Sequence, residues 1–498
     1  MAEYELVTKH VAWIGIARFI NYGRGLILLP ILTKVLGAGD YGVWSLILVT
    51  ISLLLPFVML GLPYGMGRFL PAERDRRKAS KGIFTTLFTI LFTSIIFASC
   101  LFFLADTVAT VLLKDASFAP IIRIASLLVI LQALSQLSVE SFMPFRQVKT
   151  YSILTIIQTL MEIALVYFLV LFGFGLYGAI IALLVTRGIV LLISLPLIIS
   201  RFGFSLPSFS VFRSYLTFGL PIVPSVIFEW VITSSDRYMI GFFLGAASVG
   251  IYSASYNMGA MAAVALYIIT FATAPTVVKS YDEGKIEDTK NYLSYSLKYF
   301  LLFAIPSVFG LSILARPLLN SLTTPEFVSP GIFIVPLVAS SMIFEGVRAI
   351  YGRVVQLSKH TGIFTIASVA AGLTNIGLNI IFIPRFGVIG AAIATLISYI
   401  MVGFIMYYNS RKYIRFEVDK GFVVKSILAS IVMTSAIWAF SPVGIVKILL
   451  AIVIGIIIYF AVLFLLRGFK REELRVISKA LGLRRQVNRF KRTENHDK

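Results

Sequence analysis

LGAGDYGVWS, at residues 36–45, recurs as LGAASVGIYS at residues 244–253, and this pair of stretches decides the fold. Five of the ten positions are identical, at an offset of 208 residues. The shared LG-x-x-x-x-G pattern is typical of a tight turn between paired helices, because glycine permits a positive φ and a close helix approach. The repetition indicates that the chain consists of two related halves.

A second pair of stretches supports the same division. FGLYGAIIAL at 174–183 matches FGVIGAAIAT at 386–395, at an offset of 212 residues. The two similar offsets span six predicted helices, an even number, so both copies have the same orientation. The sequence therefore predicts two six-helix lobes, related by an axis along a membrane normal, with a cavity between them.

The composition indicates that the outer surface faces lipid. The chain has 498 residues, of which 58% are hydrophobic and 13% are charged, whereas a soluble domain carries about 25% charged residues. Apolar runs of about 20 residues are long enough to cross the hydrocarbon. We therefore predict an all-α integral membrane protein with about 14 transmembrane helices, at 11–33, 41–70, 83–104, 118–142, 151–172, 176–200, 215–243, 249–278, 292–314, 328–351, 361–383, 386–409, 421–441 and 444–466.

The distribution of Lys and Arg predicts the orientation. With the N-terminus in the cytoplasm, the inside segments carry about 30 basic residues, and the outside loops carry only Lys34, Lys114, Arg316 and Arg385. Both termini are therefore expected on the cytoplasmic side of the cell membrane. The predicted parts are a first lobe at 1–210, a second lobe at 211–412, two further spans at 413–468 and a basic cytoplasmic tail at 469–498, which is expected to touch anionic membrane lipid.

Several functional classes are excluded. The net charge is +21, but the basic residues are spread over short loops and the tail, which argues against nucleic acid as a partner. Cys100 is the only cysteine and the three histidines are scattered, so we expect neither a disulfide nor a metal site. The sequence has no G-x-x-x-x-G-K-[ST] loop and no Asp-x-Asp. We expect no enzyme activity and no cofactor, and a coupling ion remains open.

Charged residues inside the predicted spans are the candidate binding groups, because charges buried in a bilayer are costly and tend to line a cavity. Arginines outnumber acids there, which suits a phosphate or pyrophosphate that accepts paired hydrogen bonds from guanidinium groups. The candidates are Arg18, Asn21, Arg24, Arg187, Glu229, Asp236, Arg237, Glu345 and Arg348.

Some of these charges have a structural alternative. Asp236 with Arg237, and Glu345 with Arg348, could be plain intramembrane ion pairs. Arg68, Arg123 and Glu140 lie near predicted span ends and are expected mainly to snorkel to the interface. Gly23 and Gly25 would allow the first span to bend, and Pro221 with Pro224 should break the start of the seventh.

The chain resembles the oligosaccharide flippases of polysaccharide biosynthesis, in the multidrug/oligosaccharidyl-lipid/polysaccharide exporter superfamily. The resemblance rests on residues 36–44, on SDRYMIGFFLGAASVGIYSAS at 235–255 and on NIIFIPRFGVIGAAIAT at 379–395, and extends over about 10–410. It implies a cationic cavity, alternating access and a polyprenyl-(pyro)phosphate-linked oligosaccharide as cargo. Peptidoglycan-precursor flippases are relatives with arginines on their first spans, which favours Arg18 and Arg24. Other polysaccharide assembly proteins are candidate partners.

Two other functions stay open. A multidrug or cation antiporter of the same superfamily would use buried acids for coupling, and Glu162, Glu229 and Asp236 are candidates. The excess of arginine and the thirteenth and fourteenth spans argue against it. A scaffold or biogenesis role is the remaining alternative.

Overall fold

The computed structural model describes residues 2–73, 75–360, 362–469 and 473, and every regular element in these ranges is helical. Apart from Phe469 and Glu473, the predicted tail lies outside these ranges, with Arg484, Arg485, Arg489, Lys491 and Arg492. The α-helices are α1 (Ala2–Met59), α2 (Leu62–Phe69), α3 (Arg76–Phe103), α4 (Ala105–Leu112), α5 (Ala119–Glu140), α6 (Val148–Leu169), α7 (Gly175–Phe202), α8 (Phe209–Gly219), α9 (Val223–Leu244), α10 (Ala246–Ala260), α11 (Val264–Asp282), α12 (Ile286–Leu322), α13 (Val328–Leu357), α14 (Gly362–Ser410), α15 (Lys420–Phe440) and α16 (Ile445–Leu465).

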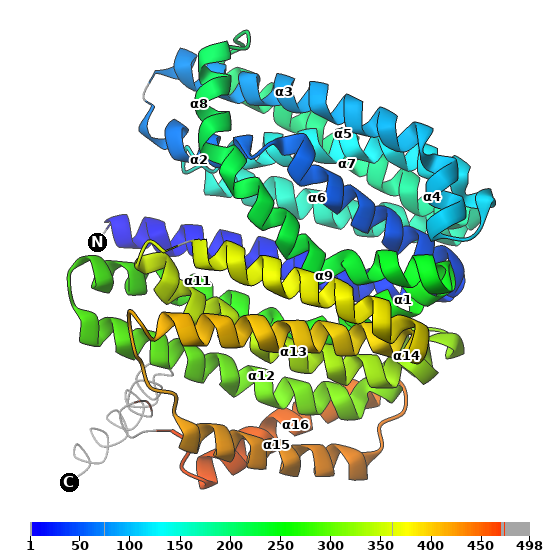
Figure 1. Cartoon of the computed structure of the whole chain (residues 1–498), viewed down its shortest axis with the longest axis vertical. Helices are drawn as coiled ribbons and strands as arrows, with labels where there is room; N and C mark the ends of the chain where they lie inside the picture. Colours follow the sequence, from blue (N-terminus) through cyan, green and yellow to red (C-terminus); the bar gives the residue numbers. More distant parts are fainter. Residues whose placement is uncertain (1, 74, 361, 470–472, 474–498) are drawn as a thin grey trace, which may run out of the picture.

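The helices account for 14 membrane crossings, as predicted. In the described part of the chain, ten helical segments are long and apolar enough to span a membrane. Three of them, at 13–59, 148–202 and 362–410, have 47, 55 and 49 residues, which is roughly twice what a bilayer requires. Each reverses direction at a glycine turn and so crosses twice (Figure 1). The bent pair Ala246–Thr270 and Ala272–Asp282 supplies one more span.

The turns confirm the internal repeat at the level of the backbone. Gly37 and Gly245, the glycines of the first repeated motif, have φ values of 71° and 86°. Gly175 and Gly387, in the second motif, have φ values of 52° and 59°. Residues other than glycine rarely adopt these positive φ values. Each of the two repeated motifs therefore encodes a turn with a positive φ at glycine, and each turn occurs once in each half.

Two groups of helices are visible in Figure 1: α3, α5 and α7 form the upper group, and α12, α13 and α14 the lower one. The boundaries at 210 and 412 stay a prediction. α8 packs closely against α2, where a Cβ on Gly65 would lie 2.7 Å from the Cα of Tyr215. The turn at Leu220–Ile222 then separates α8 from α9, as Pro221 and Pro224 predict. The backbone of α1 remains helical through Gly23 and Gly25.

The two copies of the first motif contact each other. We call Gly42, Ser45, Gly250 and Ser253 the glycine–serine crossing. A Cβ on Gly42 would lie 1.8 Å from the carbonyl oxygen of Ala246, and a Cβ on Gly250 would lie 2.1 Å from that of Ala38. Ser45 Oγ donates to Ser253 Oγ at 2.6 Å. Because each contact pairs equivalent positions, the pseudo-two-fold axis passes through this crossing.

The same end of the molecule is sealed by contacts between the lobes, at the turns predicted to face outward. Glu326 Oε1 accepts from the backbone N–H of Ala38 at 2.8 Å, and Lys34 Nζ donates to the carbonyl of Ser321 at 2.7 Å. A further contact between the lobes is made by Lys114, whose Nζ donates to the carbonyl of Phe243 at 3.0 Å. The lobes are therefore in direct contact at this end.

Helices α15 and α16 lie outside the repeat and pack on α12. Tyr459 donates to the carbonyl of Leu302 at 2.9 Å. Lys298 Nζ lies 2.9 Å from Glu473 and 3.4 Å from Asp419. This buried cation thus joins the last two spans to the second lobe.

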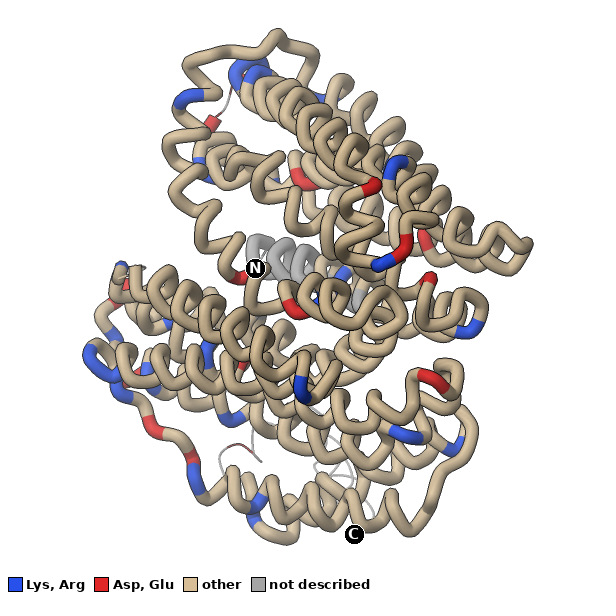
Figure 2. Tube along the Cα trace, turned by 45° about the vertical axis from the view of Figure 1, so that its right-hand side comes forward, with Lys and Arg blue, Asp and Glu red and all other residues tan. Residues whose placement is uncertain are grey.

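In Figure 2 the basic residues are denser along the left-hand edge than at the right.

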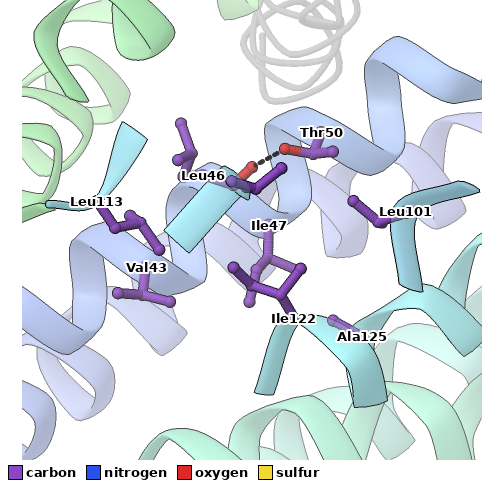
Figure 3. Close-up of a pocket in the computed structure, with 9 residues that line it drawn as sticks. Val43, Leu46, Ile47, Thr50, Leu101, Leu113, Ile122 and Ala125 are labelled. Carbon is purple, nitrogen blue, oxygen red and sulfur yellow. Dashed lines mark hydrogen bonds between the residues drawn. The ribbon is translucent and has the colours of Figure 1, made fainter. Parts of the chain in front are cut away.

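A small void lies inside the first lobe (Figure 3). Its volume is about 10 Å³, and its lining is almost wholly apolar, with Val43, Ile47 and Ile122 among the side chains. The hydroxyl of Thr50 turns away to the carbonyl of Leu46 at 2.8 Å. An apolar void of about one water's volume offers a ligand no polar partner, and none of the candidate binding residues lines it.

Candidate functional site

Most of the predicted site residues form three charged clusters, and two others lie on an accessible face of α1. The first cluster joins Arg24 and Arg187 through Glu162. The second contains Glu229, Glu345 and Arg348, and the third contains Asp236 and Arg237. Arg18 and Asn21 are exposed on α1, on the N-terminal side of Arg24.

The first cluster, which we call the Arg–Glu–Arg cluster, consists of Arg24 on α1, Glu162 on α6 and Arg187 on α7. Nη1 of Arg24 lies 2.8 and 2.9 Å from the two carboxylate oxygens of Glu162. Nη2 of Arg187 lies 2.9 Å from Glu162 Oε2. Nε of Arg187 donates to Gln132 Oε1 on α5 at 2.5 Å. Two guanidinium groups therefore share one carboxylate, and the formal charge of the cluster is +1.

Exposure differs within the Arg–Glu–Arg cluster. The side chain of Arg24 is 32% exposed, whereas those of Arg187 and Glu162 are 7% and 4% exposed. An anion approaching this cluster would meet Arg24 first. The buried carboxylate orients both guanidinium groups, and the accessible one retains donors for a ligand.

Sequence reasoning missed how this cluster is built. Glu162 lies 138 residues from Arg24 and 25 residues from Arg187, so the sequence alone does not indicate that the three side chains meet. Glu162 was considered only as a coupling acid of the antiporter alternative, and Gln132 was not a candidate. The available signal was a lone acid within an otherwise apolar span, since such a group requires a partner.

The second cluster has the opposite charge. Arg348 donates to both oxygens of Glu345, at 2.6 Å from Nε and 2.6 Å from Nη2. Nη2 also lies 3.0 Å from Glu229 Oε1 on α9. Glu229 is 53% exposed and Arg348 is 13% exposed. The pair of Glu345 and Arg348 on α13 is thus an ion pair extended to α9, and the cluster has a formal charge of −1.

The repeat places different residues at equivalent positions of the two lobes. With the offset of 208, Asn21 corresponds to Glu229, and with the offset of 212, Arg187 corresponds to Tyr399. The halves share a backbone but not a charge pattern. The cationic cluster belongs to the first half and the anionic cluster to the second.

The third cluster is enclosed by protein. Asp236 is completely buried and Arg237 is 6% exposed. Nη1 of Arg237 lies 3.2 Å from Asp236 and 2.8 Å from the carbonyl of Thr233, and its guanidinium carbon lies 4.4 Å from the ring centre of Tyr256. Tyr252 donates to the other oxygen of Asp236. The geometry favours the structural alternative, an intramembrane ion pair.

We expect Asp236→Ala to destabilise the protein strongly, because it leaves the buried Arg237 guanidinium without its counter-charge. Removing one partner of a buried ion pair costs about 3–5 kcal/mol. Thermal unfolding of the purified protein in detergent measures the effect. Asp106→Ala is the matched control, since Asp106 pairs with Arg123 at 2.5 Å on the exposed surface. An equal melting temperature for both variants would contradict the structural role.

The three charges expected near span ends are not part of these clusters. Arg68 is exposed in the last turn of α2. Glu140 accepts from Gln136 at 3.0 Å, and Arg123 pairs with Asp106. Within the described ranges, no group of three or more His, Cys, Asp or Glu residues could hold a metal ion.

Two family models match the chain. The model described as "Polysaccharide biosynthesis protein" matches residues 7–281. The model described as "Lipid II flippase MurJ" matches residues 239–464. The two matches together include all three charged clusters.

Two curated relatives are named as flippases. The chain is similar to the "Probable low-salt glycan biosynthesis flippase Agl15" of Haloferax volcanii, with 24% identity over 358 residues, 70% of this chain and 74% of the relative. It is also similar to the "Probable flippase AglR" of the same organism, with 28% identity over 259 residues, 50% of this chain and 53% of the relative.

Solved structures share the fold. A lipid II flippase MurJ in an inward closed conformation matches with a TM-score of 0.72 and 18% identity, over 90% of this chain and 97% of that one. An inward-facing multidrug transporter of the MATE family matches with a TM-score of 0.67 and 16% identity, over 80% and 94%. Because the first family model covers more than half of the 498 residues, the chain belongs to the polysaccharide biosynthesis protein family.

Proposed function

We propose that the chain is a flippase that moves a polyprenyl-(pyro)phosphate-linked oligosaccharide across the cell membrane by alternating access, for cell-surface glycan biosynthesis. The observation that carries the proposal is the Arg–Glu–Arg cluster: two guanidinium groups within membrane spans share one carboxylate, and one of them is accessible. The relative named as a glycan biosynthesis flippase supports the same cargo class.

The chemistry of the cluster fits a phosphate headgroup. Guanidinium groups donate paired hydrogen bonds to phosphate oxygens, and these bonds are about twice as strong as neutral ones. A bilayer interior offers no water to solvate a phosphate, so fixed donors must replace its hydration. Arg24 and Arg187 would hold the phosphate, while the polyprenyl chain stays in lipid. Arg18 and Asn21, on the same helix as Arg24, would extend the path.

The proposed transport cycle uses the two lobes as rigid bodies. Both termini are placed in the cytoplasm, because the inside segments then hold most of the basic residues. The sealed end, with the glycine–serine crossing, then faces outward, and cargo enters from the cytoplasmic side. Rocking of the lobes breaks the seal and exposes the headgroup outside.

An antiporter is supported less well. Of the three acids that it could use for coupling, Glu162 and Asp236 are ion-paired to arginine in this structure, and Glu229 contacts Arg348. Efflux of cationic dyes from cells that express the chain would favour the antiporter. Movement of a lipid-linked glycan in vesicles, without its hydrolysis, supports the flippase.

We expect Arg24→Ala to lower transport of a labelled lipid-linked glycan roughly ten- to hundredfold, because a charge-assisted hydrogen bond to the headgroup contributes about 1.5–3 kcal/mol. Arg24→Lys should restore part of the rate, since it keeps the charge without the fork. The measurement is initial rate in vesicles reconstituted with equal amounts of protein. Arg77→Ala, an exposed arginine at the start of α3, is the control. A normal rate for Arg24→Ala would refute the assignment of the headgroup site.

A further inference from the structure

One buried nitrogen of the Arg–Glu–Arg cluster, Nη1 of Arg187, has no hydrogen-bond acceptor among the described residues. The other two nitrogens of the same guanidinium are used, by Gln132 and by Glu162. A buried donor without an acceptor carries a large desolvation penalty. The cluster therefore presents a fixed donor for which the described part of the protein supplies no acceptor.

The two arginines differ in how firmly they are held. Arg187 is fixed from two helices, by Gln132 on α5 and Glu162 on α6. Among the described residues, the guanidinium of Arg24 is held by the Glu162 carboxylate through Nη1, and the side chain of Arg24 is one-third exposed. A competing anion could remove Arg24 from Glu162 without disturbing the buried pair of Glu162 with Arg187.

We infer that Glu162 is the resident counter-anion of the phosphate site: an arriving phosphate displaces Glu162 from Arg24 and accepts from Nη1 of Arg187, while Glu162 stays on Nη2 of Arg187. Glu162 is thus a positioning residue that competes with cargo. The inference rests on the proposed function for the identity of that phosphate as a lipid headgroup.

This arrangement has a consequence for release. The Arg24–Glu162 ion pair joins α1 to α6, and a bound phosphate breaks this ion pair. When the phosphate leaves, Glu162 recaptures Arg24 and prevents the anion from rebinding. Without the carboxylate, two cations would hold the phosphate with no internal competitor. Binding would tighten and release would slow, so tighter binding would not raise the transport rate.

Binding of farnesyl phosphate, a short prenyl monophosphate, to the purified full-length protein in detergent tests the inference by calorimetry. Glu162→Gln is expected to bind it about tenfold more tightly than the unmodified protein, as one charge-assisted bond no longer competes. In vesicles the same variant should show a lower KM for the lipid-linked glycan together with a lower kcat. A merely structural role would lower kcat without lowering KM.

Glu140→Gln is the matched control, because it removes another carboxylate of the first lobe, part-buried, that accepts from Gln136 rather than from arginine. It should leave the affinity unchanged. If Glu162→Gln fails to fold, Glu162→Asp decides, since its shorter carboxylate weakens the contact with Arg24 and should still tighten binding. Unchanged or weaker binding in the variant that folds, or no binding in any variant, would overturn the inference.

Inorganic phosphate, in a parallel titration, identifies the source of the ligand. A lipid headgroup site should bind farnesyl phosphate more tightly than inorganic phosphate, and equal affinities would overturn the headgroup part of the inference. The proposed function is tested separately by transport in the unmodified protein. Transport without tighter binding by Glu162→Gln refutes this inference alone, whereas tighter binding without any transport refutes only the flippase.

Discussion

Gly42→Ala is expected to lower transport about five- to hundredfold. The added Cβ would lie 1.8 Å from the carbonyl oxygen of Ala246, so the two helices must separate by roughly 1.5 Å to reach normal contact. Overpacking of this kind costs about 1–3 kcal/mol. The penalty falls only on the state in which the lobes meet at the glycine–serine crossing, so the population moves to the state in which they are apart.

Gly39→Ala is the matched control for that experiment. Gly39 lies in the same turn, and a Cβ on it would meet nothing within 4 Å. Alanine is a better helix former than glycine by about 1 kcal/mol, so a loss of transport in Gly42→Ala cannot come from helix propensity. Initial rates in vesicles compare the two variants. Equal rates would mean that the lobes need not meet at Gly42.

The duplicated glycines explain why the fold could be predicted from the sequence. A left-handed turn and a close backbone approach each require the absence of a Cβ, so both structural features are visible in the sequence as glycines. Gly37 and Gly245 show the first feature, and Gly42 and Gly250 show the second. The sequence predicted the close approach of paired helices but not that the two copies contact each other.

The candidate site could be predicted only in part, for a physical reason. Charged residues inside apolar spans are visible in the sequence because they are costly there, and this signal found Arg24 and Arg187. Their shared partner, Glu162, lies on a third helix, and only tertiary packing brings it to them. Pairs within one helix, such as Glu345 with Arg348, were visible from their spacing of three residues.

The asymmetry of the lobes follows from the same distinction. Backbone geometry is kept in both halves because the turns and crossings need it, but the charges are not duplicated. The first half holds the +1 cluster and the second half the −1 cluster. A symmetric scaffold can therefore rock about its axis while the cluster of net positive charge, which suits an anion, lies in the first half alone of the two clusters compared. The charge pattern and the pseudo-symmetry thus carry separate parts of the proposed function.

A disulfide between Ser45→Cys and Ser253→Cys is expected to stop transport completely in the cross-linked fraction. The two hydroxyl oxygens are 2.6 Å apart across the pseudo-two-fold axis, so the side chains at these two positions point toward each other, as a disulfide requires. The cross-link would hold the lobes together at the sealed end, and cargo could not leave on that side. Cys100, which is exposed, is first replaced by serine so that only the new pair reacts.

The control separates locking of the lobes from cross-linking as such. Ser138 and Ser194 have the same separation between their hydroxyl oxygens, 2.6 Å, but they lie on α5 and α7 of one lobe. A disulfide between Ser138→Cys and Ser194→Cys should leave transport nearly unchanged, because it joins helices that move together. Transport is measured after membrane-permeant oxidation and again after reduction, which should restore the 45–253 variant. If the oxidised 45–253 variant still transports, the lobes do not part at the crossing, and rocking about this axis is wrong.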